Sequence, residues 1–176
     1  MNKIFTITGA ILMLGACSNT NVDYYKDVKP EVNFEEFFSD DIVGWGIVQN
    51  RKGQVVRRFD IKMNGTWDGD KCVLKEDFFY YDGEEQKRIW TVIKKDNGEF
   101  EGTADDILGT ATGKTSGNAI NWHYSMDLPV GGKTYRVKFD DWMWQMNDGV
   151  LINRSYIKKF GVTVAELTLI LQKVEK

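Results

Sequence analysis

The sequence is poor in proline, cysteine and histidine, and each shortage argues against a class of protein. Only 2 Pro accompany 17 Gly among 176 residues, a balance that suits strands and tight turns better than helices. One His and 2 Cys are too few for a typical structural zinc site or a disulfide framework. The net charge is only −3, and the basic residues are spread along the chain, so a nucleic-acid surface is not expected.

Long apolar runs are also missing. Residues 4–15 are apolar except for two Thr, and they cover about half of the ~20 residues that span a bilayer as a helix. A short basic start that includes Lys3 precedes this run, which is typical of a secretory signal. The run ends in Leu14-Gly15-Ala16-Cys17, which resembles the lipobox of bacterial lipoproteins. The resemblance implies cleavage before Cys17, acylation of that cysteine and, with Ser18 next to it, an outer-membrane location facing the periplasm.

Three regions follow from this interpretation. Residues 1–16 are expected to be a lipoprotein signal peptide, 17–33 a polar tether, and 34–176 one β-barrel domain. A domain of this size can bury a core without disulfides or metals. Cys72 then has no partner for an internal disulfide, and we interpret it as a small core or surface residue.

The folded domain is expected to be all-β. Residues 34–38 have the apolar spacing of one short helical turn, and about ten strands with hairpin-length turns follow. The strand-like segments are 45–49, 55–63, 72–81, 87–95, 99–104, 107–114, 119–126, 134–140, 142–146, 150–159 and 166–174. Asp82-Gly83 and Gly131-Gly132 are among the turn signals.

A meander of this length is expected to close into a single antiparallel up-and-down barrel, because closure removes its exposed edges. The segment 55–63 alternates, with Phe59, Ile61 and Met63 on one face and charged residues on the other. An outer-membrane barrel would need an apolar outer band and a polar lumen. The dense charges on the polar faces predict the reverse arrangement, with water outside and an apolar interior.

Several motifs resemble known sites and fail on inspection. Residues 109–115 resemble a phosphate-binding loop, but they have three residues between the glycines where the motif needs four. Residues 64–69 resemble the start of a calcium loop, yet Lys75 stands where the closing carboxylate belongs. The only His, His123, is interpreted as a surface or hydrogen-bonded strand residue. No cofactor and no metal are expected.

Two acidic dipeptides, Asp105-Asp106 and Asp140-Asp141, are candidates for catalytic carboxylate pairs. Neighbours along a strand point to opposite faces, so neither dipeptide forms an acid/base pair by itself, although one member of each can face inward. An enzyme acting on a lipid or small molecule therefore stays a minor hypothesis. It requires an inward Asp close to His123 or Arg154.

The positive signal is a set of aromatic and polar residues on faces expected to point inward. Glu76 and Arg88 are expected to pair across a hairpin, because buried charges need partners. They would either orient a ligand headgroup in an apolar cup or form a salt bridge in a filled core. The candidate ligand-binding residues are Glu76, Arg88, Trp90, Trp122, Tyr124, Trp142 and Trp144.

Stretches across the domain resemble an uncharacterised family of bacterial lipoproteins, domain of unknown function family 3833. They include Gly44-Trp45-Gly46-Ile47, Arg88-Ile89-Trp90 and Asp140-Asp141-Trp142-Met143. The resemblance implies a lipocalin-like (calycin) fold and tilts the expected ligand toward lipids, but it supplies no activity. True lipocalins place a late-strand Arg over a first-strand Trp. Here Arg154 and Trp45 are the candidates for such a structural clasp.

The leading hypothesis is a lipid-anchored barrel that carries a fatty-acyl or other small amphiphilic ligand in the cell envelope. The main alternative is a closed structural barrel whose surface docks an envelope partner. An internal cavity of about 300 Å³ or more separates the first from the second.

Overall fold

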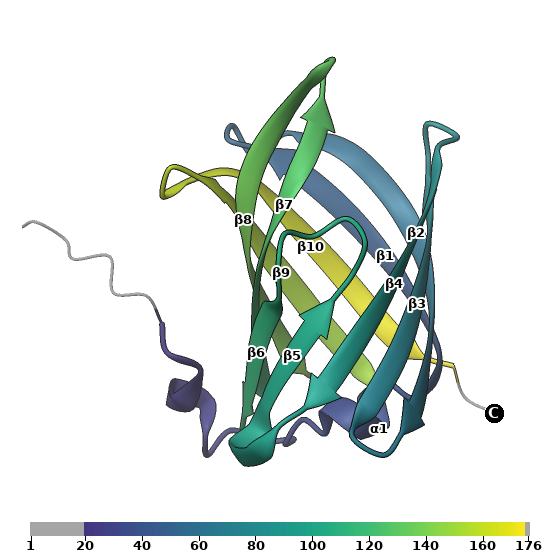
Figure 1. Cartoon of the computed structure of the whole chain (residues 1–176), viewed down its shortest axis with the longest axis vertical. Helices are drawn as coiled ribbons and strands as arrows, with labels where there is room; N and C mark the ends of the chain where they lie inside the picture. The colour runs from purple at the N-terminus through teal and green to yellow at the C-terminus, as the bar shows by residue number, and fades with distance from the viewer. Residues whose placement is uncertain (1–19, 175–176) are drawn as a thin grey trace, which may run out of the picture.

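The computed structural model describes residues 20–174, and its ten strands form one closed antiparallel barrel (Figure 1). The strands are β1 (Asp40–Asn50), β2 (Val55–Asp68), β3 (Lys71–Tyr80), β4 (Glu85–Lys94), β5 (Glu99–Thr103), β6 (Ala111–Ser116), β7 (Ala119–Val130), β8 (Lys133–Gln145), β9 (Val150–Lys159) and β10 (Val162–Lys173). Each strand pairs with its neighbours in sequence, and β10 returns to pair with β1. The predicted all-β up-and-down barrel is therefore confirmed, and it is compatible with a lipocalin-like fold.

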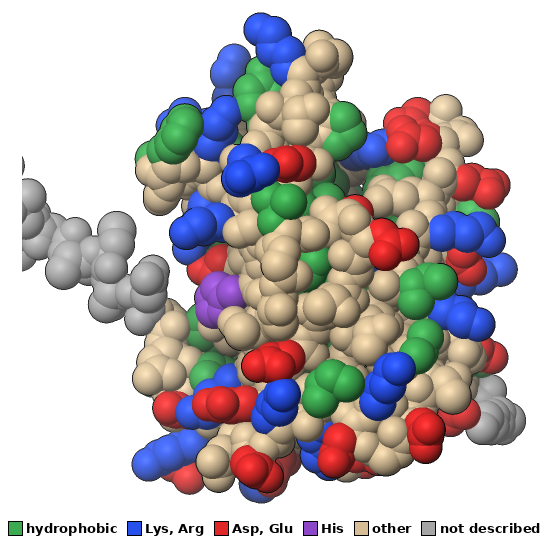
Figure 2. Space-filling view, viewed as in Figure 1, with side chains coloured by type: hydrophobic (Ala, Val, Ile, Leu, Met, Phe, Trp, Pro, Cys, Tyr) green, Lys and Arg blue, Asp and Glu red, His purple; other side chains and the backbone are tan. Residues whose placement is uncertain are grey.

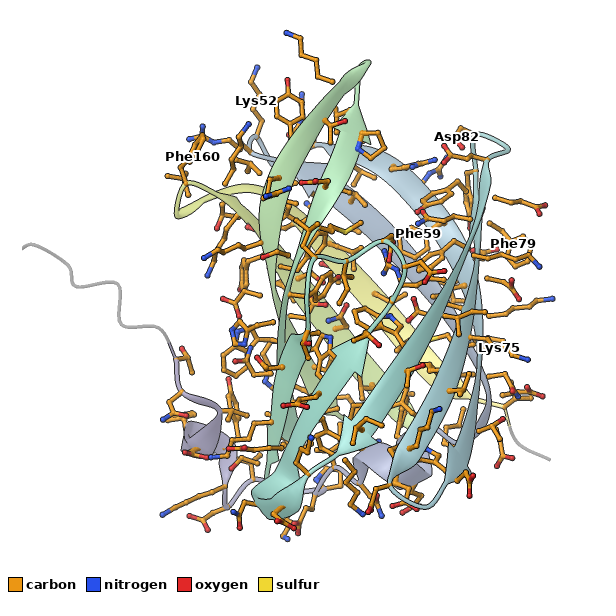
Figure 3. All side chains as sticks on the ribbon, viewed as in Figure 1. Lys52, Phe59, Lys75, Phe79, Asp82 and Phe160 are labelled. Atoms are coloured by element: carbon orange, nitrogen blue, oxygen red, sulfur yellow. The ribbon has the colours of Figure 1, made fainter. Side chains whose placement is uncertain are left out.

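Alternation of side chains separates the inside of the barrel from the outside. Along β2, Phe59, Ile61 and Met63 are buried. Figure 3 shows Phe59 within the barrel, whereas Phe79 and Lys75 of β3 point away from it. Charged side chains of both signs cover the outer face in Figure 2. This arrangement confirms the prediction of an apolar interior and a charged exterior.

Two strand predictions needed correction. The segments 134–140 and 142–146 are one continuous strand, β8, and the expected strand at 107–114 starts only at Ala111. Residues 104–110 instead form the connection between β5 and β6, in which Ile107 makes a single bridge to Met126 of β7. The apolar residues Ile107 and Leu108 made this connection look like a strand, although its turns prevent regular pairing.

A short helix closes the lower end of the barrel in Figure 1. Helix α1 (Phe34–Phe37) begins after Asn33, whose side chain accepts a hydrogen bond from the backbone N–H of Glu36 at 3.1 Å. Phe34 and Phe37 are buried, and the Phe34 ring stacks on Phe100 of β5 with 4.3 Å between centroids. The predicted helical turn before the first strand is thus present, and it serves as a plug of the core.

The segment before α1 packs against the barrel wall. It contains a 3-10 helix, η1 (Val22–Tyr25). Another short 3-10 turn, η2 (Asp96–Gly98), lies far from this segment in the sequence and joins β4 to β5. Val22 and Val32 are buried, and the Tyr25 ring lies 6.0 Å from that of Trp142. Residues 20–33, expected to belong to a polar tether, therefore lie in contact with the folded domain.

Trp122 is buried in the core, where two glycines leave room for its ring. A Cβ atom at Gly113 would lie 2.0 Å from Cε3 of the Trp122 ring, and a Cβ at Gly102 would lie 2.6 Å from its Cζ2. Gly113, in the segment 109–115 that resembles a phosphate-binding loop, thus provides a bare backbone surface on which the Trp122 ring packs.

Substitution of Gly113 by alanine is expected to destabilise the barrel by about 1–3 kcal/mol, because the Trp122 ring must move away from the added methyl group. Urea denaturation followed by tryptophan fluorescence measures the change. The matched control is Thr112→Ala on the same strand, where the side chain is exposed and the effect should stay within about 0.5 kcal/mol. Equal effects of the two substitutions would contradict this account of Trp122.

Candidate functional site

The interior of the barrel contains a cavity of about 110 Å³ above the helical plug. Its walls are mainly apolar and aromatic, and they come from α1 and from seven strands on both sides of the barrel. The polar side chains in the lining are Glu76, Arg88, Tyr124, Asp141, Asn153 and Ser155. An apolar chamber with a few convergent polar groups is the usual form of a small-molecule site.

One wall carries the ion pair that the sequence predicts. Glu76 of β3 and Arg88 of β4 are direct partners in the register of the two strands, and Arg88 Nη1 lies 3.7 Å from Glu76 Oε2. A closer partner comes from the connection between β5 and β6. Arg88 donates from Nε and Nη2 to Asp106, at 2.9 and 2.7 Å. The guanidinium is therefore committed mainly to Asp106, a pairing that the sequence did not predict.

The connection that carries Asp106 covers a gap in the hydrogen bonding of the barrel wall. β5 pairs with β4 only at residues 91–94, and β6 pairs with β7 only at residues 119–123. The upper parts of β4 and β7 are bridged instead by residues 104–110, through Asp106 on Arg88 and the backbone hydrogen bond from Leu108 to Ser125 at 2.7 Å. Figure 1 shows this connection at the upper ends of β5 and β6.

The other wall presents a second buried carboxyl group, Asp141 of β8, which is 8% exposed. Beside it lie Asn153 and Ser155 of β9, and Asn153 donates to the backbone oxygen of Trp142 at 3.0 Å. Asp141 is the inward member of the acidic dipeptide, and Asp140 is the outward member. Every second residue of a strand shares a face, so the apolar residues Val137 and Phe139 could have identified Asp141 as inward.

Both buried carboxyl groups have one oxygen without a hydrogen-bond partner among the described residues, namely Oε2 of Glu76 and Oδ1 of Asp141. Burial raises the pKa of Glu76 to about 7, against the lowering effect of Arg88, while the Asp106 charge adds to the rise. Burial likewise raises the pKa of Asp141 to about 7, although a hydrogen bond from Ser155 opposes the rise. Buried acceptors without a hydrogen bond are costly in a closed core and are frequent at functional sites.

Aromatic side chains complete the site. Trp90 lies edge-to-face with Trp122 at 5.8 Å between centroids and with Tyr124 at 5.4 Å. Burial, together with the negative charge of Asp141, raises the pKa of Tyr124 well above its usual value. Of the seven candidate ligand-binding residues, five therefore surround the cavity: Glu76, Arg88, Trp90, Trp122 and Tyr124.

The other two candidates, Trp142 and Trp144, do not line the cavity. They lie on the outer face of β8, because Asp141 and Met143 on either side of Trp142 face inward. Their rings stack on each other with 6.1 Å between centroids, and Tyr25 packs against both. The sequence pattern predicted that the aromatic face of β8 points into the barrel. This face instead points outward, where Tyr25 of η1 covers it.

The predicted clasp between Trp45 and Arg154 is also not formed among the contacts of the described residues. Trp45 is 50% exposed on the outer face of β1. Arg154 pairs instead with its neighbours on β10, with Nη1 3.4 Å from Glu166 and a hydrogen bond to Thr168 at 3.2 Å.

The enzyme hypothesis required an inward Asp beside His123 or Arg154. His123 Nε2 lies 3.1 Å from Asp140 Oδ1 on the outer face, where Lys158 also contacts Asp140 at 2.6 Å. Neither Asp106 nor Asp141 shares a hydrogen bond or ion pair with His123 or Arg154 in the described part of the chain. The arrangement gives this hypothesis no support.

Cys72 is fully buried in β3, and burial raises the pKa of its thiol to about 11. A thiol in this state is a poor nucleophile, which fits a small core residue. Within residues 20–174, no helix has the length and apolar character needed to cross a membrane. The same residues contain no group of three or more His, Cys, Asp or Glu arranged to hold a metal ion.

Comparison with known proteins identifies a family without identifying an activity. A family model described as "Protein of unknown function (DUF3833)" matches residues 11–173, which is nearly the whole chain. No curated protein matches the sequence.

Proposed function

Because the chain belongs to the DUF3833 family, for which no function is described, we propose a role from the site itself: an envelope lipoprotein whose barrel binds a small ligand in its interior cavity. The observation that carries the proposal is the pair of buried carboxyl oxygens without a hydrogen bond, on Glu76 and Asp141, in one apolar chamber. A purely structural core would be more stable with these groups replaced by apolar side chains. Their presence is explained if a ligand supplies the missing partners.

The size of the cavity sets the class of ligand. At about 110 Å³ it is smaller than the ~300 Å³ expected for the carrier of a complete acyl chain. A compact amphiphile, or the head and first carbons of a larger one, fits this volume.

The second candidate function is a closed barrel that docks an envelope partner, and the small cavity is the observation that favours it. Exposed apolar side chains lie on the hairpins at the end of the barrel opposite α1. Phe160, labelled in Figure 3, is 94% exposed, Val130 is 57% exposed and Val162 is 51% exposed. On this alternative, the interior holds no ligand and these hairpins contact the partner.

Native mass spectrometry of the protein, extracted in mild detergent from its own membrane, separates the two candidates. Ligand binding predicts a population heavier than the acylated chain by the mass of a small molecule, which collisional activation removes. A bare acylated mass under the gentlest conditions would favour the docking alternative.

The lipid anchor has its own test. Cys17 lies outside the described residues, and Thr20, the first of them, follows it by three positions. The Cys17→Ser variant is expected to leave the membrane pellet and to lack acyl mass, since the acyl chains provide the anchoring energy. The matched control, Cys72→Ala, should remain in the pellet with its acyl chains. Retention of the Cys17→Ser variant in washed membranes would contradict acylation at this site.

A further inference from the structure

Two buried carboxyl groups, those of Glu76 and Asp141, line the cavity, and they define the chemistry of the ligand. On the premise that the cavity binds a ligand, we propose that the ligand is a compact amine whose cationic nitrogen lies between Glu76 and Asp141. The two residues come from β3 and β8, on opposite walls of the barrel, and both line the same cavity.

The charges around the cavity support a cation. Three carboxyl groups, those of Glu76, Asp106 and Asp141, accompany one guanidinium, that of Arg88. Arg88 uses Nε and Nη2 on Asp106 and lies farther, at 3.7 Å, from Glu76. When all four groups are charged, the net charge is −2, and a bound ammonium group would halve it. A carboxylate or phosphate would increase the negative charge in a buried site.

The hydrogen-bonding state of the two carboxyl groups also favours a cationic amine. Oε2 of Glu76 and Oδ1 of Asp141 accept no hydrogen bond from the described residues, although Arg88 Nη1 lies 3.7 Å from the first, and both residues are more than nine-tenths buried. A primary ammonium carries three N–H donors and no acceptor, so it complements a site whose free atoms are carboxyl oxygens. A fatty-acid carboxylate has no donor to offer either of them.

The aromatic walls suit the same ligand. Trp90 makes edge-to-face contacts with both Trp122 and Tyr124, and all three rings line the cavity with the two carboxyl groups. Indole and phenol faces attract cations, and aromatic side chains line many ammonium sites in proteins. Leu74, Val92 and other apolar residues provide the surface for a short hydrocarbon chain. The volume of about 110 Å³ suits a short hydrocarbon chain.

Three probes with the same six-carbon chain, n-hexylamine, n-hexanol and hexanoate, test the assignment. The full-length chain with Cys17→Ser avoids acylation, and calorimetry together with the fluorescence of Trp90 and Trp122 reports binding at pH 8. Hexylamine is expected to bind about tenfold or more tightly than hexanol, because each charged hydrogen bond strengthens binding by about that factor. Hexanoate should bind more weakly than either.

Site variants identify where the amine lies. Glu76→Gln and Asp141→Asn should each weaken hexylamine about tenfold and change hexanol by less than about twofold. Asp140→Asn, next to Asp141 but on the outer face, is the matched control and should bind hexylamine as the parent chain does.

The pH profile provides a second readout. The groups that face the site are Glu76, Arg88, Asp106, Tyr124 and Asp141. Of these, Glu76 and Asp141 take up protons as the pH falls through about 7, so hexylamine binding should decline between pH 8 and 5. Hexanol binding should stay nearly constant over the same range.

The outcomes distinguish this inference from the proposed function. If hexanol or hexanoate binds as tightly as hexylamine, the cavity binds ligands and the amine assignment is overturned. If hexylamine binding is unchanged in both Glu76→Gln and Asp141→Asn, the amine lies elsewhere and the assignment is again overturned. If none of the three probes binds and the native mass is also bare, both proposals fail.

Discussion

Replacement of Arg88 by methionine is expected to lower the free energy of unfolding by about 3–5 kcal/mol at pH 8, because it leaves the buried Glu76 and the half-buried Asp106 without their cation. The Arg88 side chain is 13% exposed and serves both Glu76 and Asp106. Methionine keeps much of the apolar stem, so the loss reports mainly on the charge. Urea denaturation at a series of pH values measures it.

The stability lost in the Arg88→Met variant should be smaller at pH 5.5 than at pH 8. The pKa of Glu76 is about 7, so its carboxyl group is mostly protonated at pH 5.5 and gains little from Arg88 even in the parent chain. The double variant Arg88→Met/Glu76→Gln should recover part of the stability lost at pH 8, since only the half-buried Asp106 then lacks its cation. An equal loss at both pH values, with no recovery in the double variant, would refute the role given to Glu76.

Arg136→Met provides the control for loss of a cation from an ion pair. Arg136 contacts Asp127 at 2.9 Å, but its side chain is 69% exposed. Exposed ion pairs of this kind contribute less than about 1 kcal/mol, so this variant should be close to the parent chain in stability.

The second large effect is a gain of stability, expected from Asp141→Asn at pH 8. The pKa of Asp141 is raised from 3.8 to about 7, so the folded state binds this proton more tightly than the unfolded state does. The resulting stabilisation is complete below pH about 4 and is lost as the pH rises through about 7. At pH 8 the ionised group therefore costs on the order of 4 kcal/mol, because each tenfold difference in proton affinity corresponds to about 1.4 kcal/mol.

Asparagine has the same shape and carries no charge, but its amide leaves an N–H donor without a partner, which costs about 1–2 kcal/mol. The net expectation is a variant about 2 kcal/mol more stable than the parent chain at pH 8 and slightly less stable at pH 5. Denaturation curves at the two pH values test this reversal of sign. A variant that is less stable than the parent at both values would show that Asp141 has partners beyond those described.

Asp140→Asn should behave in the opposite way, although it changes the preceding residue. Burial acts to raise the pKa of Asp140, but hydrogen bonds from Lys158 and Asn121 and the charges of Lys158 and His123 outweigh it and lower the pKa. This carboxylate stabilises the fold above pH about 4, and the stabilisation is lost as the pH falls through its lowered pKa. Its removal should therefore lower stability at pH 8. Asp140→Asn and Asp141→Asn together compare the outer and inner faces of β8.

A stabilising effect of Asp141→Asn bears directly on function. Proteins retain destabilising polar groups where activity depends on them, so a substitution that improves stability and weakens amine binding would mark a functional site. A gain in stability without any loss of binding would instead leave Asp141 unexplained.

Much of the fold could be predicted because the information is local. Alternation along β2 and β3 placed Phe59, Ile61 and Glu76 on the inner face, and turn residues such as Asp82-Gly83 marked the hairpins. The Glu76–Arg88 pair followed from the same reasoning, since the two residues face each other across a single hairpin. Antiparallel neighbours joined by short turns allow register to be inferred from sequence.

The errors arose where both faces of a strand are buried. β8 has apolar or aromatic residues on both faces, so its pattern did not show which face points inward. Packing of η1 on Trp142 and Trp144 decided the matter, and that contact joins segments more than a hundred residues apart. Asp106 was missed for a related reason: it reaches Arg88 from an irregular connection that has no periodicity.

The sequence by itself determined that the chain forms strands in succession with apolar and charged faces, because these properties depend on neighbouring residues. Only the tertiary structure decided that Glu76 and Asp141 share one small cavity and that a connecting segment supplies the main partner of Arg88. Those facts depend on closure of the barrel and on the volume left by the packed aromatic rings. Neither quantity is encoded in any short stretch of the chain.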